Sequence, residues 1–343
     1  MITAGFIFLF SLYHRYYQSV LLNMFSRRLL RIKVLQILYA HYKASGKTYI
    51  QSEKDLIYSL NKSYELYHYL MLLLLDVTEY AESRIELSMM KNIPDWEDLH
   101  PNRKFIDNQF IRQLKQCQSL TDFIKSKKLQ WTQFPEIIKN LYYFLMETEF
   151  YKEYMNNSGQ SHNDDKKLVI QIYHDLIMNY EDLYKNLEDQ NIYWIDDVDF
   201  IIKMIIKTFK KFRENESNPQ LLPMFHDEED LDFSKKLLRK TILRHEENNS
   251  LISNSAKNWE LERIAFTDYL IIQMAITEAV EFRSIPVKVT MNEFIEISKI
   301  FSTRRSSQFI NGILENIFTG LKKEKKILKQ GRGLIGEPDY DRT

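Results

Sequence analysis

Glycine, proline and cysteine are all scarce in this chain of 343 residues. It has 8 glycines and 7 prolines, where average usage would give about 24 and about 17. Sheets joined by tight turns and phosphate-binding loops both need glycine, so the shortage favours long helices with few connections. The single cysteine, Cys117, excludes an internal disulfide and any zinc site built from several cysteines, and it fits a reducing cytoplasm.

The motifs of several enzyme classes are also missing. The chain contains no GxxxxGK[ST] and no HExxH. It has no excess charge of one sign either, because Lys+Arg and Asp+Glu are both 47. A protein that coats nucleic acid non-specifically would be strongly basic, so any phosphate-binding surface must be a local patch. We therefore predict no cofactor and no metal site.

Hydrophobic runs long enough to span a bilayer are absent as well. The apolar run at the amino end stops at His14 and Arg15, and YLMLLLL, which begins at Tyr69, is closed by Asp76. The first run also lacks the basic leader and the cleavage site of a secretory signal. We predict that residues 1–23 are an accessory extension, with Met24 as the natural start, and that the protein is cytoplasmic without a membrane anchor.

Helical periodicity is what the sequence does have, and it predicts an all-α fold. The stretch MFSRRLLRIKVLQILYAHY, from Met24 to Tyr42, predicts a helix whose first turns hold Arg27, Arg28 and Arg31. Positive charge at a helix start opposes the helix dipole by about 0.3–1 kcal/mol per exposed group. Either these arginines simply solvate the helix end, or something negative meets them.

Near the carboxyl end, the apolar positions fit a helix that packs on one face. They are Phe309, Ile310, Ile313, Leu314, Ile317, Phe318 and Leu321. Before them, STRRSS, from Ser302 to Ser307, predicts a turn and a helix N-cap with Arg304 and Arg305 exposed. Gly312 lies inside the helix, and we predict that it permits the close approach of another helix.

Two separated stretches together resemble the NusB transcription antitermination family. SRRLLRIKVLQILYAHY resembles its opening helix, with Tyr39 in the expected place. IPVKVTMNEFIEISKIFSTRRSSQFINGILENI, from Ile285 to Ile317, resembles its closing helices, in which P-x-K-V leads to N-E-x-I-E-x-A-K and then to F-[VI]-N-G-[VI]-L. One departure is that Arg304 and Arg305 stand where the family has an acidic pair, so no contact made by an acid can be carried over there.

The resemblance implies the domain organisation and the function. The family is usually far shorter, so this chain is similar to long, Bacteroidetes-like forms. We predict an accessory extension over 1–23, the first helix of a NusB-like domain over 24–44, an inserted helical region over 45–190, the rest of the domain over 191–328 and a disordered tail over 329–343. The resemblance implies binding to boxA-type RNA of nascent ribosomal RNA transcripts with NusE, a ribosomal protein, to promote read-through by RNA polymerase, without catalysis.

The chemistry of the residues supports the same site. The guanidinium group of arginine donates paired hydrogen bonds to phosphates and base edges and stacks on unpaired bases, and the amino end of a helix already attracts anions. The predicted RNA-binding residues are Arg27, Arg28, Arg31, Arg304, Arg305 and Gln308. The resemblance further implies partner contacts by Tyr39 and Asp268. Charge reversal at Arg27 and Arg31 is expected to weaken RNA binding without unfolding the protein.

Two alternatives stay open on the sequence. A helical scaffold that binds proteins but not RNA would keep the same fold, and the inserted region could carry its contacts. An HD-type metal phosphohydrolase would use HD pairs such as His174–Asp175 and His226–Asp227. Adjacent matches of two residues are expected by chance in a charged chain, so we favour the adaptor.

Overall fold

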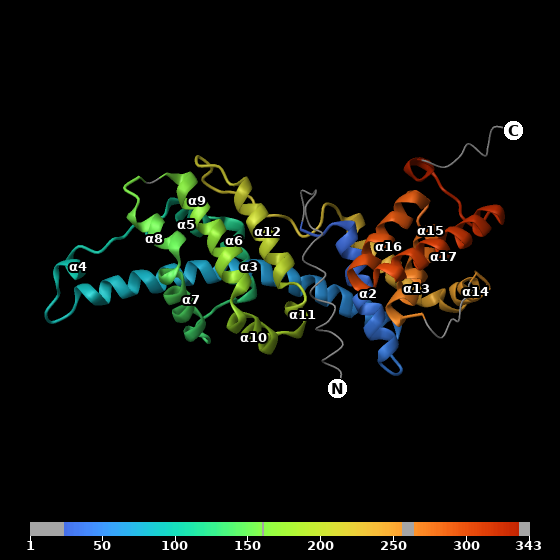
Figure 1. Cartoon of the computed structure of the whole chain (residues 1–343), viewed down its shortest axis with the longest axis horizontal. Helices are drawn as coiled ribbons and strands as arrows, with labels where there is room; N and C mark the ends of the chain where they lie inside the picture. Colours follow the sequence, from blue (N-terminus) through green and yellow to red (C-terminus); the bar gives the residue numbers. More distant parts are fainter. Residues whose placement is uncertain (1–23, 160, 256–263, 336–343) are drawn as a thin grey trace. The chain divides into compact units, whose positions relative to one another are not determined.

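The computed structural model describes residues 24–159, 161–255 and 264–335 (Figure 1). All regular elements in these residues are helices, which confirms the predicted all-α class. The chain divides into two compact units, one formed by Met1–Leu60 with Met224–Thr343 and the other by Asn61–Pro223. The predicted extension over 1–23 lies outside the described residues. Within the described ranges, no helix is both long and apolar enough to cross a membrane.

The first unit, which we call unit 1, combines one helix from the amino end with helices from the last third of the chain. Its elements are α2 (Arg27–Lys43), the start of α3 (Tyr49–Met89), α13 (Glu228–Leu243), α14 (His245–Ser255), α15 (Phe266–Glu281), α16 (Val287–Phe301), α17 (Arg304–Lys323) and the 3-10 turn η5 (Gly331–Leu334). Helix α2 packs against α13, α15 and α16, although nearly two hundred residues separate α2 from α13. The two stretches that carry the family resemblance therefore belong to one packed unit.

Helix α15 is the centre of unit 1. It contacts α2, α13, α14, α16 and α17. Its buried positions run almost continuously from Leu270 to Ala279, so no polar stripe faces solvent over this stretch. A helix that is buried on all sides is typical of the middle of a bundle.

Helix α17 follows the predicted pattern closely. Six of the seven predicted apolar positions are buried, whereas Phe309 is half-buried. Thr303 caps the helix by accepting a hydrogen bond from Ser306 N at 3.2 Å, so the predicted N-cap is confirmed. The role predicted for Gly312 is wrong, because a Cβ atom built there meets no atom within 4 Å. Gly312 is exposed, and no helix approaches it in the part of the chain that the structure describes.

The second unit, unit 2, is built around the rest of α3. Its other elements are α4 (Trp96–Leu99), α5 (Gln109–Lys115), α6 (Gln118–Lys127), α7 (Pro135–Glu147), α8 (Glu149–Asn156), α9 (His162–Gln171), the π-helix η2 (Ile172–Leu176), the 3-10 helix η3 (Ile177–Asn179), α10 (Glu181–Gln190), α11 (Ile192–Ile195) and α12 (Val198–Lys211). Aromatic side chains of the later segments bond to the backbone of α3. Trp131 Nε1 donates to Tyr69 O at 3.0 Å, and the Tyr173 hydroxyl donates to Leu70 O at 2.7 Å.

The boundaries of unit 2 differ from those of the predicted insertion, residues 45–190. Unit 2 begins inside α3 and includes α12, because α12 packs against α9, η2 and η3. The insertion relative to the family stays a prediction.

The first residues of the predicted disordered tail, 329–335, are packed against unit 1. Lys329 Nζ donates to Phe282 O at 2.9 Å, and Gln330 N donates to Arg283 O at 3.0 Å. Gly333 is buried against the same turn. Residues 329–335 therefore pack on the connection between α15 and α16, and 336–343 lie outside the described residues.

Candidate functional site

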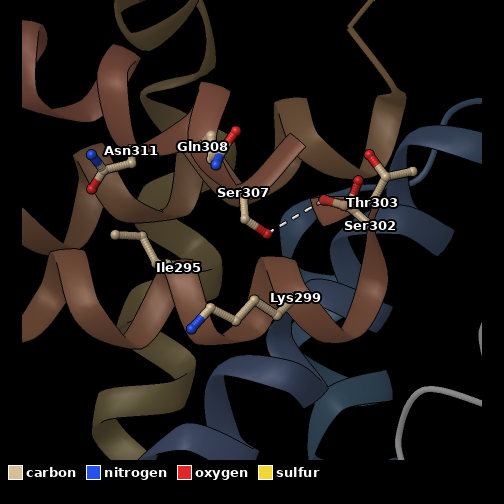
Figure 2. A pocket seen from close by; sticks show the side chains of 7 residues that line it. All are labelled: Ile295, Lys299, Ser302, Thr303, Ser307, Gln308 and Asn311. Atoms are coloured by element: carbon tan, nitrogen blue, oxygen red, sulfur yellow. Dashed lines mark hydrogen bonds between the residues drawn. The ribbon is translucent and has the colours of Figure 1, made fainter. Parts of the chain in front are cut away.

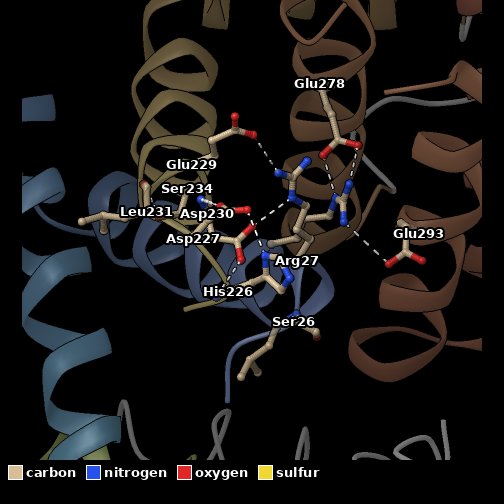
Figure 3. A network of polar contacts seen from close by, with 12 residues as sticks. Ser26, Arg27, His226, Asp227, Glu229, Asp230, Leu231, Ser234, Glu278 and Glu293 are labelled. Atoms are coloured by element: carbon tan, nitrogen blue, oxygen red, sulfur yellow. Dashed lines mark hydrogen bonds and ion pairs between the residues drawn. The ribbon is translucent and has the colours of Figure 1, made fainter. Parts of the chain in front are cut away.

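The start of α2 holds the arginines that raised the question of a negative partner. Ser26 is the N-cap and accepts a hydrogen bond from Leu29 N at 3.3 Å, while no acidic residue lies in the first helical turn. The negative charge comes instead from carboxylates of α13, α15 and α16, and Figure 3 shows this network. The arginines and the carboxylates together form what we call the α2 ion-pair cluster.

Arg27 is the most accessible arginine of the cluster. Its Nε donates to Asp230 Oδ1 at 3.0 Å, and its Nη2 lies 3.8 Å from Glu229 Oε2. The side chain of Arg27 is 40% exposed, whereas that of Asp230 is nearly buried. An ion pair with this exposure contributes about 0–1 kcal/mol to stability, so Arg27 can exchange partners at small cost.

Arg28 makes a two-pronged pair with Glu293, the glutamate of the NEFIEISK motif. Its Nε and Nη2 donate to the two carboxylate oxygens at 2.8 and 2.7 Å. This pair joins the arginine cluster of the opening helix to the N-E motif of the closing helices. The two segments that carry the family resemblance thus meet in one bidentate contact.

Arg31 is buried. Its guanidinium donates to both oxygens of Glu278, with Nε–Oε2 at 2.6 Å and Nη2–Oε1 at 2.8 Å, and both side chains are almost fully excluded from solvent. Thr290 Oγ1 also donates to Glu278 Oε1, at 2.9 Å. The guanidinium carbon lies 5.1 and 5.8 Å from the ring centres of Phe233 and Phe294, within cation–π range.

The structure therefore separates the three arginines by accessibility. An RNA contact by Arg27, Arg28 and Arg31 stays a prediction, with Arg27 the most available and Arg31 the least. Sequence reasoning found the arginines but missed Asp230, Glu278 and Glu293. Only the N-E motif gave a signal, because a carboxylate in a family motif needs a partner somewhere in the fold.

A groove lies between α16 and α17, beside the start of α17 (Figure 2). Its volume is about 730 Å³, and most of its lining residues are polar: Ile295, Lys299, Ser302, Thr303, Ser307, Gln308 and Asn311. Ser307 is buried at the groove wall, and its Oγ donates to Thr303 O at 3.4 Å. A volume of this size accommodates a nucleotide base.

The second group of predicted RNA-binding residues lies at this groove. Arg304 and Arg305 are the first two residues of α17, directly after the Thr303 cap, but their side chains are not among the described ones. Gln308 lies one turn further on, is exposed and lines the groove with Asn311. The amides of Gln308 and Asn311 can both donate and accept hydrogen bonds, as unpaired bases require. RNA contacts by Arg304, Arg305 and Gln308 stay predictions.

Tyr39, a predicted partner-binding residue, lies in a half-exposed aromatic cluster on unit 1. Its ring packs against Phe266 with 5.5 Å between ring centres, and the Lys43 ammonium lies 4.6 Å from the centre of the Phe266 ring. Tyr42 extends the cluster and shares a 3.0 Å hydrogen bond with His245 Nδ1. The partner contact of Tyr39 stays a prediction.

Asp268, the other predicted partner-binding residue, is buried in the first turn of α15. Its Oδ1 has no hydrogen-bond partner among the described residues. The buried side chain offers little surface to a partner. The partner contact of Asp268 stays a prediction.

The two HD pairs are separate and belong to different units. His174 Nδ1 lies 2.6 Å from Asp175 Oδ1, and His226 Nδ1 lies 3.0 Å from Asp227 Oδ2; all four side chains are largely exposed. Among the described residues, no group of three or more His, Cys, Asp and Glu is arranged to hold a metal ion.

Part of the chain is similar to known proteins. A family model described as "NusB family" matches residues 195–319, from α11 to α17. The transcription antitermination protein NusB of Salinibacter ruber is 41% identical over 115 residues, which are 34% of this chain and 72% of that protein. Those of Symbiobacterium thermophilum and Chloroherpeton thalassium are 37% and 38% identical over 107 residues, or 31% of this chain, and the matches cover 70% and 51% of those proteins. No solved structure matches.

Proposed function

This chain belongs to the NusB family of transcription antitermination factors, which are not enzymes, and from that premise we propose that it binds boxA-type single-stranded RNA of nascent ribosomal RNA transcripts. It does so together with NusE. The resulting complex promotes read-through by RNA polymerase in the cytoplasm. The observation that carries this proposal is the match over α11–α17, which contains the groove and the glutamates that pair with α2.

The distribution of charge supports RNA binding by unit 1. The whole chain is neutral, but unit 1 has 27 Lys and Arg against 21 Asp and Glu, a net charge of +6. Unit 2 has 20 against 26, a net charge of −6. Phosphate groups are attracted to the unit with the positive excess.

The proposed RNA surface consists of Arg27 and Arg28 at the start of α2 and of Arg304, Arg305 and Gln308 at the start of α17. Arg31 has a supporting role in this surface, because its pair with Glu278 holds α2 against α15. A phosphate would compete with the exposed Glu229 for Arg27 and with the half-buried Glu293 for Arg28.

The test is fluorescence anisotropy of a short boxA-like RNA with the full chain, alone and with NusE, at several salt concentrations. Binding should be weak alone, tighter with NusE and reduced by salt. Arg27→Ala and Arg304→Ala should each reduce the magnitude of the negative slope of log K against log salt by about 0.7, because each variant removes one cation that meets a phosphate. The matched control is Arg112→Ala, since Arg112 is an exposed arginine of unit 2 that also pairs with a carboxylate, Asp107.

The second candidate is a protein scaffold without RNA binding. It is favoured by the engagement of all three arginines of α2 by carboxylates of the same chain. RNA that fails to bind under every salt condition, with NusE present, would select the scaffold and reject the adaptor.

A further inference from the structure

The carboxyl end of α3 and the short helix α4 expose an unusual number of apolar side chains. Within residues 87–99, six large apolar side chains are between 45% and 90% exposed: Leu87, Met89, Met90, Ile93, Trp96 and Leu99. We call these six residues the α3–α4 tip. Scattered exposed apolar residues are normal, but a dense group usually marks an interaction site.

The tip is held in a defined conformation. Asp95 and Asp98 form a capping box around α4, with Asp98 N–Asp95 Oδ1 at 2.7 Å and Asp95 N–Asp98 Oδ2 at 3.1 Å. Lys91 Nζ donates to both oxygens of Asp98, at 2.7 and 2.9 Å. These bonds fix the turn between α3 and α4. Because the backbone of the turn is already ordered, a partner that binds there pays little entropy for ordering it.

Trp96 is the most informative member of the tip. Its indole stacks on His100, with ring centres 4.5 Å apart and an angle of 19° between the planes, yet the residue is 72% exposed. The two buried tryptophans of unit 2, Trp131 and Trp194, both donate to backbone carbonyls of α3. Trp is one of the residue types most enriched among the few interface residues that carry most of the protein–protein binding energy.

The charges around the tip indicate the kind of partner. Glu86, Asp95 and Glu97 are exposed beside the apolar side chains and outnumber the exposed Arg84, while the charge of Lys91 is compensated by Asp98. Unit 2, which contains the tip, has a net charge of −6. This field repels phosphate and favours a positively charged partner.

We propose that the α3–α4 tip docks a protein segment with an apolar face flanked by lysine or arginine, such as a basic amphipathic helix. Trp96 and Ile93 provide the apolar anchors, and Glu86 and Glu97 meet the basic side chains at the rim. The tip lies outside residues 195–319, the part matched by the family model, so the proposal does not depend on RNA binding by unit 1.

The test uses two labelled synthetic peptides with the same leucine face, one carrying lysines and the other glutamates on the polar face. Anisotropy with the full chain should show binding of the lysine peptide and none of the glutamate peptide. The double variant Trp96→Ser/Ile93→Ser should weaken that binding at least ten-fold. The charge reversal Glu86→Lys/Glu97→Lys should weaken it as well, and boxA-like RNA binding should not change in either variant.

Ile192→Ser is the matched control, because Ile192 is an isoleucine of the same unit with 73% exposure outside the tip. It should leave peptide binding unchanged, and the thermal melts of all variants should overlay that of the parent. The proposal is overturned if the lysine peptide does not bind the full chain, if the tip variant binds it as well as the parent, or if Ile192→Ser loses binding equally.

Discussion

Replacing Arg31 by methionine is expected to destabilise unit 1 by about 3–5 kcal/mol, the usual cost of breaking a buried ion pair by removing one partner. The side chain of Arg31 is 3% exposed and that of Glu278 is 0% exposed. After the substitution, the Glu278 carboxylate would stay buried with the Thr290 hydroxyl, at 2.9 Å, as its remaining described hydrogen-bond donor. The loss comes mainly from this uncompensated charge and much less from the volume of the side chain.

Two further variants separate the charge from the packing. The double variant Arg31→Met/Glu278→Leu removes both buried charges, so it should recover most of the stability that the single variant loses. Arg27→Ala breaks a pair whose arginine is 40% exposed, and the nearly buried Asp230 keeps a hydrogen bond from His226 N at 3.3 Å, so the variant should cost about 1 kcal/mol, well below Arg31→Met. The sequence predicted that neither Arg27 nor Arg31 has a structural role. We now expect this for Arg27 but not for Arg31, whose side chain is buried.

The assay is hydrogen–deuterium exchange of peptides from α2 and α15, which reports on unit 1 separately from unit 2. A loss of 3–5 kcal/mol should accelerate exchange of the best protected α15 amides by roughly two to three and a half orders of magnitude. A change of less than ten-fold in Arg31→Met would refute the reasoning. So would a double variant that exchanges as fast as the single one.

Three smaller perturbations test other parts of the fold. Burial lowers the pKa of His68 to about 4, from 6.5, so the unfolded chain binds more protons between these pH values. The corresponding stability, about 3 kcal/mol, is present above pH 6.5 and lost as the pH falls to 4. Burial raises the pKa of Asp76 to about 6, which acts in the opposite direction over this range, so the test is the difference between the parent and His68→Gln in urea melts at both pH values. Gly312→Ala should raise the free energy of unfolding by up to about 1 kcal/mol, and with it the melting temperature, because the new Cβ has no atom within 4 Å among the described residues. In Gly333→Ala the new Cβ would lie 1.9 Å from Arg283 O, so limited proteolysis should cut residues 329–335 faster than in the parent.

The local features of unit 1 were accessible from the sequence because they depend on neighbours in the chain. The apolar rhythm from Ile310 to Leu321 and the Thr303 cap each depend on residues within a few turns. Helix periodicity and capping are properties of that range. The family motif extended the same information to the fold.

The exposure of the arginines was not accessible in this way. The partners of Arg27, Arg28 and Arg31 lie 203, 265 and 247 residues further along the chain. A run of arginines looks the same whether water, phosphate or a distant carboxylate surrounds it. Composition failed in a similar manner for residues 329–335, where the glycines and lysines typical of a tail pack on the backbone at Phe282 and Arg283.

The separation of α2 from its partners also has a consequence for the growing chain. During synthesis α2 emerges first, and 184 residues must follow Lys43 before α13 begins at Glu228. At about 5–20 residues per second, this interval lasts roughly 10–40 s. Throughout it the apolar side chains of α2 and the arginine that Glu278 will neutralise have none of their final neighbours in α13, α15 and α16. The ribosome thus releases all of unit 2, a continuous segment, before unit 1 can close, and α2 is the segment that a nascent-chain chaperone would meet longest.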